Sequence, residues 1–400
     1  MRSLRVLWWL TVPGLVLCVG CHKPAEEVAI TPQPDYAAPL PPGELALRRI
    51  TDPNRIPDFS PGFIFRTRLR DAVDRSLNYM SKPSSHSYFP YGDITHERAV
   101  ASLKAFREVL DQARSGEELN DRVRQRFDVY ESVGYNGEGI VWFTGYYRPI
   151  FDARLKQDAE FKYPLYGLPD DLVKDPEGNC IGRRQAEGST TPRYYDRREI
   201  ETSRLLAGKE IAWLRDPFEA YIVTVQGSGK MRLEDGTYYE IGYAANNGYD
   251  YVPVGPKLVE DGKIPSNELS LKRMIDFFKL YPNEITYYTH MNPRYVFFMP
   301  RTGGPFGSLN EPVTPYRTIA TDKDVYPRAC VAFVKNILPG REAGTIVQKR
   351  YEAFALDQDT GGAIRAPGRC DIFLGTGDTQ GELAGRTTIE GRLYYIFVKQ

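Results

Sequence analysis

Two aspartate-bearing segments near the C-terminus hold the residues best suited to acid–base chemistry. Residues 357–364 read DQDTGGAI, and residues 369–377 read RCDIFLGTG. Glycines in both segments let one backbone approach another closely, so Asp359 and Asp371 can be brought together. A carboxylic acid kept protonated near neutral pH, by burial or a like-charged neighbour, can protonate a glycosidic oxygen. The same spacing also fits a structural pair, in which Asp359 caps a turn and Asp371 fixes a barrel corner.

Other catalytic sites fit the sequence less well. Residues 359–361 (DTG) form the triplet of aspartic peptidases, which need two such loops, and residues 377–380 (GDTQ) are a poor second copy, so a peptidase would require a homodimer. Ser228 does not lie in the GxSxG motif of a nucleophilic serine. The spacing of the four histidines also does not indicate a Ser-His-Asp triad. Residues 225–229 (VQGSG) satisfy neither phosphate-loop pattern. Their side chains and amides could instead line a groove for sugar hydroxyls, although such segments are often only turns.

Composition and cysteine spacing exclude several classes of protein. The 400 residues include 52 Lys plus Arg and 52 Asp plus Glu, so no net field exists to gather nucleic acid. With 12% aromatic and 26% charged residues, the chain is neither disordered nor a multi-span membrane protein. Cys180, Cys330 and Cys370 lack CxxC spacing, which predicts no metal site and at most one disulfide. We expect no cofactor.

The N-terminus has the anatomy of an export signal. Arg2 and Arg5 precede an apolar run, and residues 1–20 are predicted to be a signal peptide that ends before Cys21. Cleavage without acylation and an uncleaved anchor are the alternatives. Residues 21–44 are rich in proline and predict a tether that packs no core.

Hydrophobic spacing predicts helices early in the chain and strands later. Leu69 to Met80, Ala99 to Leu110 (opened by Thr95 as N-cap) and Leu119 to Tyr130 show helical periodicity. From about residue 139 the pattern changes to short strands, broken by one helix at Leu271 to Phe278. The predicted strands are Ile140 to Phe143, Tyr221 to Val225, Cys330 to Val334, Tyr351 to Leu356, Cys370 to Leu374 and Leu393 to Val398. Short strands with glycine-rich turns favour a barrel over a doubly wound sheet.

An ordered set of motifs resembles the membrane-bound lytic murein transglycosylase A family. The likeness spans about residues 103–399, and residues 318–398 resemble the family's 3D domain, named for three aspartates. The motifs are Gly145-Tyr146-Tyr147, Val225-Gln226-Gly227-Ser228-Gly229, Tyr243-Ala244-Ala245 with Asn247-Gly248, Tyr295-Val296-Phe297-Phe298, Val313-Thr314-Pro315 with Arg317, and Asp359 to Ile364.

This resemblance implies a mainly β fold with N-terminal helices. The family has a double-psi β-barrel that carries an inserted smaller β domain, with a groove between them for a glycan strand. By this likeness, residues 45–148 and 293–400 would form the catalytic barrel and residues 149–292 the insert. Arg148 stands where many relatives have Glu, which changes the charge at the groove edge.

The resemblance also implies a reaction and its residues. Asp371 would be the single catalytic acid and base, with Asp359 and Thr144 as neighbours that hold the site. The family cleaves the MurNAc–GlcNAc bond of peptidoglycan and leaves 1,6-anhydromuramoyl ends, without water or metal. The expected substrate-binding residues are Tyr146, Gln226, Gly227, Ser228, Gly229, Asn247, Arg317 and Thr360.

The resemblance predicts partners and a location as well. Cys21 would carry a lipid, and the residue after it, His22 rather than Asp, favours the periplasmic face of the outer membrane. We expect a monomer that binds glycan strands and works within a cell-wall synthesis complex. The alternative is a lipoprotein that binds peptidoglycan without cleaving it.

Overall fold

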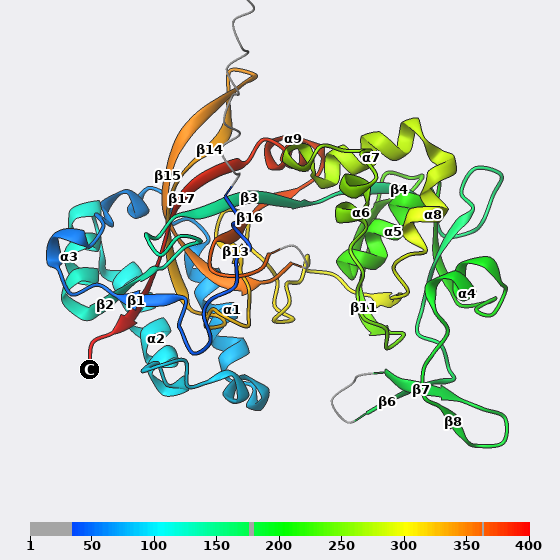
Figure 1. The fold of residues 1–400 in the computed structure, drawn as a ribbon, viewed down its shortest axis with the longest axis horizontal. Helices are drawn as coiled ribbons and strands as arrows, with labels where there is room; N and C mark the ends of the chain where they lie inside the picture. The colour runs from blue at the N-terminus through cyan, green and yellow to red at the C-terminus, as the bar shows by residue number, and fades with distance from the viewer. Residues whose placement is uncertain (1–33, 176–179, 362–363) are drawn as a thin grey trace, which may run out of the picture. The chain divides into compact units, whose positions relative to one another are not determined.

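Residues 34–175, 180–361 and 364–400 are described by the computed structural model, and Figure 1 shows their path. The predicted signal peptide and Cys21 lie outside these residues. The strands are β1 (Leu47–Arg49), β2 (Phe127–Ser132), β3 (Val141–Arg148), β4 (Ile150–Arg154), β5 (Tyr163–Tyr166), β6 (Leu172–Lys174), β7 (Cys180–Arg184), β8 (Thr190–Thr191), β9 (Glu210–Leu214), β10 (Ser228–Arg232), β11 (Tyr238–Asn246), β12 (Val296–Pro300), β13 (Thr318–Ala320), β14 (Val331–Glu342), β15 (Thr345–Asp359), β16 (Arg369–Thr376) and β17 (Thr388–Val398). The α-helices are α1 (Leu69–Met80), α2 (His96–Gln112), α3 (Gly116–Arg126), α4 (Arg197–Thr202), α5 (Pro217–Gln226), α6 (Val254–Glu260), α7 (Leu271–Leu280), α8 (Ile285–Thr289) and α9 (Asp378–Ala384).

Six strands close into a barrel. Their order is β17, β14, β15, β13, β16 and β3, and β3 pairs back onto β17 to complete the ring. The pairs β13–β15 and β16–β3 are parallel, and the other pairs of the ring are antiparallel. Closure removes the free edges that an open sheet would expose. The predicted barrel is therefore confirmed.

Helices α1 to α3 share one hydrophobic core with the barrel strands. The predicted helices at 69–80 and 99–110 are confirmed as α1 and α2, and the Thr95 side chain accepts a hydrogen bond from the Arg98 N–H as an N-cap does. The expected continuation of the third helix to Tyr130 is wrong, because α3 ends at Arg126. Residues 127–132 are entirely buried as β2, where the aromatic and β-branched side chains pack in a strand that pairs with β17.

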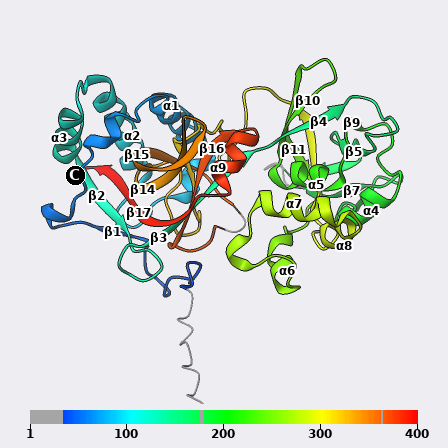
Figure 2. The ribbon, with the colours of Figure 1, turned by 90° about the horizontal axis from the view of Figure 1, so that it is seen from above.

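The chain between β3 and β13 forms a second, smaller set of sheets. A six-stranded sheet has the order β12, β11, β10, β4, β9 and β5, and a three-stranded sheet joins β6, β7 and β8. Figure 2 shows helices α4 to α8 grouped with these strands. The inserted β domain is confirmed, and so is the helix at 271–280. The domain bounds 45–148, 149–292 and 293–400 stay predictions.

The helical content of the insert is higher than the sequence indicated. Residues 221–225, expected to be a strand, lie in α5, and the one expected helix is accompanied by α4, α5, α6 and α8. Asp216 explains the error, because its carboxylate accepts hydrogen bonds from the N–H groups of Phe218 and Glu219, and Pro217 occupies the first helical position. These signals start a helix in a segment whose Val, Ile and Tyr content alone favours a strand.

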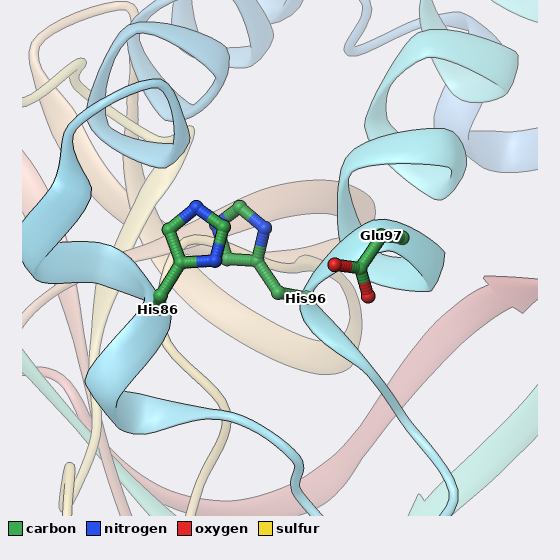
Figure 3. A group of neighbouring side chains, drawn as sticks. All are labelled: His86, His96 and Glu97. Atoms are coloured by element: carbon green, nitrogen blue, oxygen red, sulfur yellow. The ribbon is translucent and has the colours of Figure 1, made fainter.

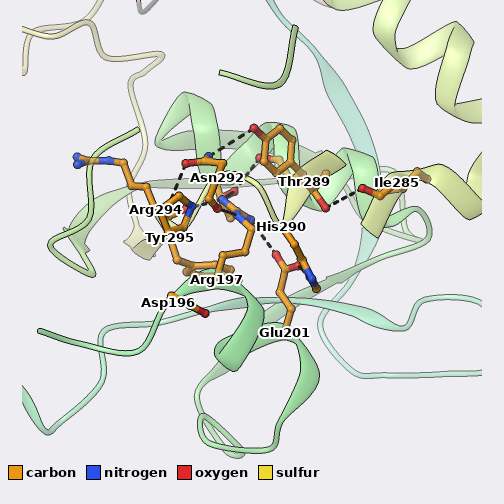
Figure 4. A network of polar contacts seen from close by, with 12 residues as sticks. Asp196, Arg197, Glu201, Ile285, Thr289, His290, Asn292, Arg294 and Tyr295 are labelled. Atoms are coloured by element: carbon orange, nitrogen blue, oxygen red, sulfur yellow. Dashed lines mark hydrogen bonds and ion pairs between the residues drawn. The ribbon is translucent and has the colours of Figure 1, made fainter. Parts of the chain in front are cut away.

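A buried arginine ties the insert together (Figure 4). The Arg197 side chain is fully buried at the start of α4. Its guanidinium donates to the carbonyls of Asn292 and Arg294 at 3.0 and 2.7 Å, to the Thr224 hydroxyl at 2.8 Å and to the Glu201 carboxylate at 2.8 Å. The Arg197 charge therefore links α4, α5 and the segment before β12.

Part of the predicted tether packs against the barrel. The Tyr36 ring stacks on Trp142 with centroids 4.9 Å apart, and its hydroxyl donates to Glu390 at 2.6 Å. Packing therefore begins before residue 45, which the proline content had obscured. The three cysteines of the described chain, Cys180, Cys330 and Cys370, are free thiols. None of the described helices has the length and apolar character needed to cross a bilayer.

Candidate active site

Strand register brings Thr144 and Asp371 side by side. The parallel pair β16–β3 sets Asp371 directly beside Thr144, and the Thr144 hydroxyl donates a hydrogen bond to Asp371 Oδ1. Paired residues of neighbouring strands point to the same face. The predicted neighbour of the acid is thus in contact with it.

A bulge in β15 brings Asp359 to the same face. Ala320 of β13 pairs with Asp371 on one side and with Asp359 on the other. Its neighbour Ile319 pairs with Asp357, so Gln358 is the extra residue of the bulge. Without the bulge, regular alternation along β15 would leave the Asp359 side chain on the face of Asp357, opposite to that of Ala320 and Asp371. Strand β13 lies between the strands of the two aspartates. Its residue at this level is Ala320, whose side chain is only a methyl group.

The bulge is fixed by the Gln358 side chain, which is fully buried. Its amide nitrogen donates to the Ala72 carbonyl at 2.7 Å and to the Ser76 hydroxyl at 3.0 Å, both on α1. Its amide oxygen accepts from the Thr318 hydroxyl at 2.8 Å. These satisfied contacts anchor the bulge to α1 and β13.

The two aspartates have different hydrogen-bond environments. Asp359 Oδ1 accepts from the N–H groups of Ser308 and Thr360, both at 2.8 Å, and Oδ2 accepts from the Tyr146 hydroxyl at 2.7 Å. Among the described residues, Asp371 accepts only from Thr144, at Oδ1. Both oxygens of Asp359 are therefore occupied, whereas Oδ2 of Asp371 is available to a ligand.

Close approach of the segment before β13 supplies one of these donors. A Cβ on Gly307 would lie 2.7 Å from the Gln358 carbonyl oxygen and 3.2 Å from the Asp359 carboxyl carbon. Only glycine lets this segment approach closely enough for the Ser308 N–H to reach Asp359. Sequence reasoning did not identify Gly307 or Ser308.

The electrostatics of the pair favour an acid at Asp371. Both residues keep part of their surface exposed, yet the surrounding protein is dense. Burial raises the pKa of Asp371 to about 6, an effect that the Arg369 guanidinium opposes and the Asp359 charge adds to. Burial also raises the pKa of Asp359, against the hydrogen bonds from Tyr146, Ser308 and Thr360. Asp371 can therefore hold and release a proton near neutral pH.

A third aspartate lies beneath the site. Asp357 is fully buried and accepts hydrogen bonds from Thr321 and Tyr395, both at 2.7 Å, and pairs with Lys323. The Lys323 side chain is itself 4% exposed. This buried ion pair supports β15 two residues before Asp359. The sequence motif contains Asp357, but its partners Lys323 and Tyr395 are distant in the chain.

The predicted binding residues do not form one group: some lie at the aspartates, some in the insert, and some are engaged in structural hydrogen bonds. The Tyr146 hydroxyl donates a hydrogen bond to Asp359, and the exposed Thr360 is the next residue in the chain after Asp359. Gln226 ends α5, Gly227 caps that helix with a φ of 68°, and Ser228 and Gly229 are buried at the start of β10. The structure therefore places these four residues in the insert.

The last two predicted binding residues, Asn247 and Arg317, are engaged in structural hydrogen bonds. The Asn247 amide is fully buried and donates to the carbonyls of Tyr195 and Pro293 at 2.9 and 2.8 Å. The Arg317 guanidinium is buried and donates to the carbonyls of Thr67 and Tyr316. The Asn247 amide thus has no free N–H for a sugar, and Arg317 uses two of its N–H donors to hold the backbone.

The unusual Arg148 has a partner in the insert. Its side chain is buried at the end of β3, and the guanidinium lies 3.4 Å from the Glu240 carboxylate of β11. The positive charge that replaces the family's Glu is therefore balanced locally.

One group in the described chain contains three potential metal ligands, His86, His96 and Glu97 (Figure 3). The two imidazole rings are stacked, with centroids 3.7 Å apart and planes inclined by 21°. Because a metal binds in the plane of each imidazole, stacked rings do not direct their nitrogens at one ion. His96 Nε2 also lies 2.9 Å from the Ser85 hydroxyl. We therefore assign this cluster no metal.

Comparison with known proteins first identifies similar domains and a similar fold. Residues 142–299 match the family described as "MltA specific insert domain", and residues 317–397 match the "3D domain". A solved "membrane-bound lytic murein transglycosylase from Agrobacterium tumefaciens" has a TM-score of 0.71 at 24% identity, over 88% of this chain and 98% of that one. "E. coli MltA with bound chitohexaose" has a TM-score of 0.63 at 22% identity, over 92% of this chain and 97% of that one. These structures share the fold.

Sequence relatives carry the same family name. "Membrane-bound lytic murein transglycosylase A" of Vibrio cholerae is 29% identical over 329 residues, which cover 78% of this chain and 82% of the relative. The protein of the same name from Escherichia coli K12 is 25% identical over 292 residues, which cover 72% and 74%. These matches confirm the predicted resemblance to the membrane-bound lytic murein transglycosylase A family.

Proposed function

We propose that this protein is a lytic transglycosylase that cleaves the β-1,4 bond between N-acetylmuramic acid and N-acetylglucosamine in peptidoglycan. The product would carry a 1,6-anhydromuramoyl end. One observation carries the proposal: Asp371 has a pKa of about 6 and one carboxylate oxygen without a protein donor, beside a second aspartate whose oxygens are all engaged. The names of the relatives support the same activity.

In the proposed reaction, Asp371 acts twice. Its protonated carboxyl gives a proton to the glycosidic oxygen as the bond from that oxygen to the muramoyl C1 breaks. The resulting carboxylate then accepts the proton of the muramoyl C6 hydroxyl while that oxygen forms a bond to C1. The C6 hydroxyl belongs to the same sugar, so proximity replaces an activated water.

The surroundings of Asp371 fit this single-acid chemistry. Glycoside hydrolases use two carboxylates, one as acid and one as base or nucleophile. Here Asp359 accepts three hydrogen bonds and so is not free to activate water or attack carbon. We assign Asp359 the role of a fixed charge that keeps the Asp371 pKa high. Thr144 orients the acid through its hydroxyl.

We place the glycan strand in a groove between the barrel and the insert. Tyr146 and Thr360 would border the reacting sugar, and residues 226–229 would contact the strand from the insert. For Asn247 and Arg317 we propose indirect roles, because their donors hold the backbone in place. A lipid on Cys21 would hold the protein at the periplasmic face of the outer membrane, as a monomer within a cell-wall synthesis complex.

The proposal is tested by incubating purified murein sacculi with the protein and analysing the released fragments by mass spectrometry. Anhydromuramoyl ends are the expected result. Reducing ends would instead identify a muramidase that uses water. Binding to sacculi without any released fragment would identify a peptidoglycan-binding lipoprotein.

A further inference from the structure

A basic cavity lies on one face of β1, β2 and β17, on strands that do not carry the aspartate site. Its volume is about 440 Å³. It is lined by Gly137 and by the side chains of three arginines, two glutamates and a tyrosine: Arg48, Arg55, Arg392, Glu131, Glu138 and Tyr394.

Strand register explains why these side chains converge. Arg48 of β1 pairs with Glu131 of β2, and Glu131 pairs with Tyr394 of β17. Arg392 is two residues from Tyr394 on the same strand and therefore points to the same face. Arg55 joins them from the 3₁₀ turn Pro53–Arg55.

The cavity holds more positive than negative charge. The Glu131 side chain is buried, and each of its oxygens already contacts one guanidinium, with Arg55 at 2.8 Å and Arg392 at 2.9 Å. Arg48 lies 3.9 Å from Glu131, beyond hydrogen-bond distance, and donates instead to the Gly137 carbonyl at 3.3 Å. The Glu138 side chain accepts from Asn136 at 3.4 Å. Arg55 and Arg392 thus occupy both carboxylate oxygens of Glu131. The positive charge of Arg48 is therefore in excess of what Glu131 pairs with.

A like-charged neighbour strengthens this argument. Lys335 of β14 pairs directly with Arg392 on the same face, and its ammonium also lies 3.8 Å from the Glu352 carboxylate. Like charges in this position destabilise a sheet, and a nearby anion reduces the repulsion. Each guanidinium also has several N–H donors, most of which have no protein acceptor in the described chain.

We propose that this cavity binds a phosphate group, held by Arg48, Arg55 and Arg392. Guanidinium groups bind phosphate oxygens through paired N–H donors, and three of them suit an anion with more than one charged oxygen. The volume accommodates a phosphate together with a substituent. The group could come from free phosphate or from the headgroup of an anionic phospholipid.

The position in the chain favours the headgroup. Arg48 and Arg55 belong to the first strand and the first turn after the N-terminal segment. If Cys21 carries a lipid, as the proposed function holds, Arg48 follows the anchored residue by 27 positions. A chain of that length allows the cavity to reach a phosphodiester at the bilayer surface.

The test compares the thermal denaturation of the full chain with that of two variants. The probes are inorganic phosphate and glycerophosphoglycerol, the soluble headgroup of phosphatidylglycerol, each against chloride at equal ionic strength. Arg48→Gln removes the arginine least involved with Glu131. Arg49→Gln is the matched control, because Arg49 is the adjacent residue, is similarly exposed and contacts Asp128 instead.

We expect the melting temperature of the parent and of Arg49→Gln to rise saturably with phosphate. For Arg48→Gln the apparent affinity should be about tenfold weaker. A stronger response to glycerophosphoglycerol would assign the site to lipid headgroups, and a stronger response to inorganic phosphate would assign it to free phosphate. Equal shifts in all three proteins, or no saturable shift, would overturn the proposal, because a general salt effect does not depend on Arg48.

Discussion

Replacing Asp359 by Asn removes the like charge beside Asp371, and we expect the pH–activity profile to move toward acid. If Asp371 must be protonated in the free enzyme, kcat/KM falls as the pH rises through its pKa of about 6. Without the Asp359 charge, the Asp371 carboxylate is easier to form. Its pKa should therefore drop.

Strand geometry sets the size of this shift. Asp359 and Asp371 flank one residue of β13, so their backbones are separated by two strand spacings, about 10 Å. At an effective dielectric constant of about 20, two unit charges at this distance interact by about 1.7 kcal/mol. That energy corresponds to a shift of about one pH unit, or a roughly tenfold loss of kcat/KM at pH 7.

A second variant should shift the pH–activity profile in the opposite direction. Arg369 lowers the pKa of Asp371, so Arg369→Gln should move the descending limb toward higher pH. Release of muropeptides from sacculi, measured from pH 4.5 to 8.5 at low substrate, gives the profiles. The exposed Asp378, changed to Asn, is the control for simple loss of an acidic charge and should leave the limb in place. Limbs that stay fixed in both variants, or that move in the same direction, would refute the electrostatic reasoning.

Three further predictions concern positioning and stability. Gly307→Ala should lower kcat/KM by about tenfold or more with little change in folding, because the added methyl group displaces the segment that donates to Asp359. Steady-state kinetics together with circular dichroism test this prediction. Unchanged kinetics would contradict it. Arg197→Met should reduce the free energy of unfolding by about 3–5 kcal/mol in urea denaturation, since it leaves its buried acceptors unpaired; a loss below about 1 kcal/mol would contradict the assigned role. Burial and the nearby His86 lower the pKa of His96, so the unfolded chain binds more protons, and stability should fall as the pH drops below about 6.5. His96→Gln should flatten this dependence, and an equally steep profile in the variant would show that other groups cause it.

The sequence contained most of the information about the barrel. Apolar periodicity and Thr95 located α1 and α2, and short apolar runs located the strands that carry Asp371 and Tyr395. The sequence did not distinguish α5 from a strand. Asp216 is a helix N-cap, but the residues that follow it have a composition that favours a strand. Tyr130 was misassigned because its burial depends on pairing with β17, more than 250 residues later.

The site could be predicted only in part. The spacing of the motifs indicated Asp359 and Asp371 as neighbours, but the bulge that aligns them depends on Gln358 contacts with α1. Likewise, Lys323 is a partner of Asp357 only in the folded chain. Such contacts join distant segments and leave no local pattern in the sequence.

The most direct test of the account is the release of anhydro-muropeptides from sacculi by Asp371→Asn, with Asp378→Asn as the matched variant. The account predicts that Asp371→Asn folds, with an unchanged circular dichroism spectrum, and releases no anhydromuramoyl products, while Asp378→Asn retains the activity of the parent. Anhydro products from a folded Asp371→Asn protein would contradict the assignment of Asp371 as the catalytic acid.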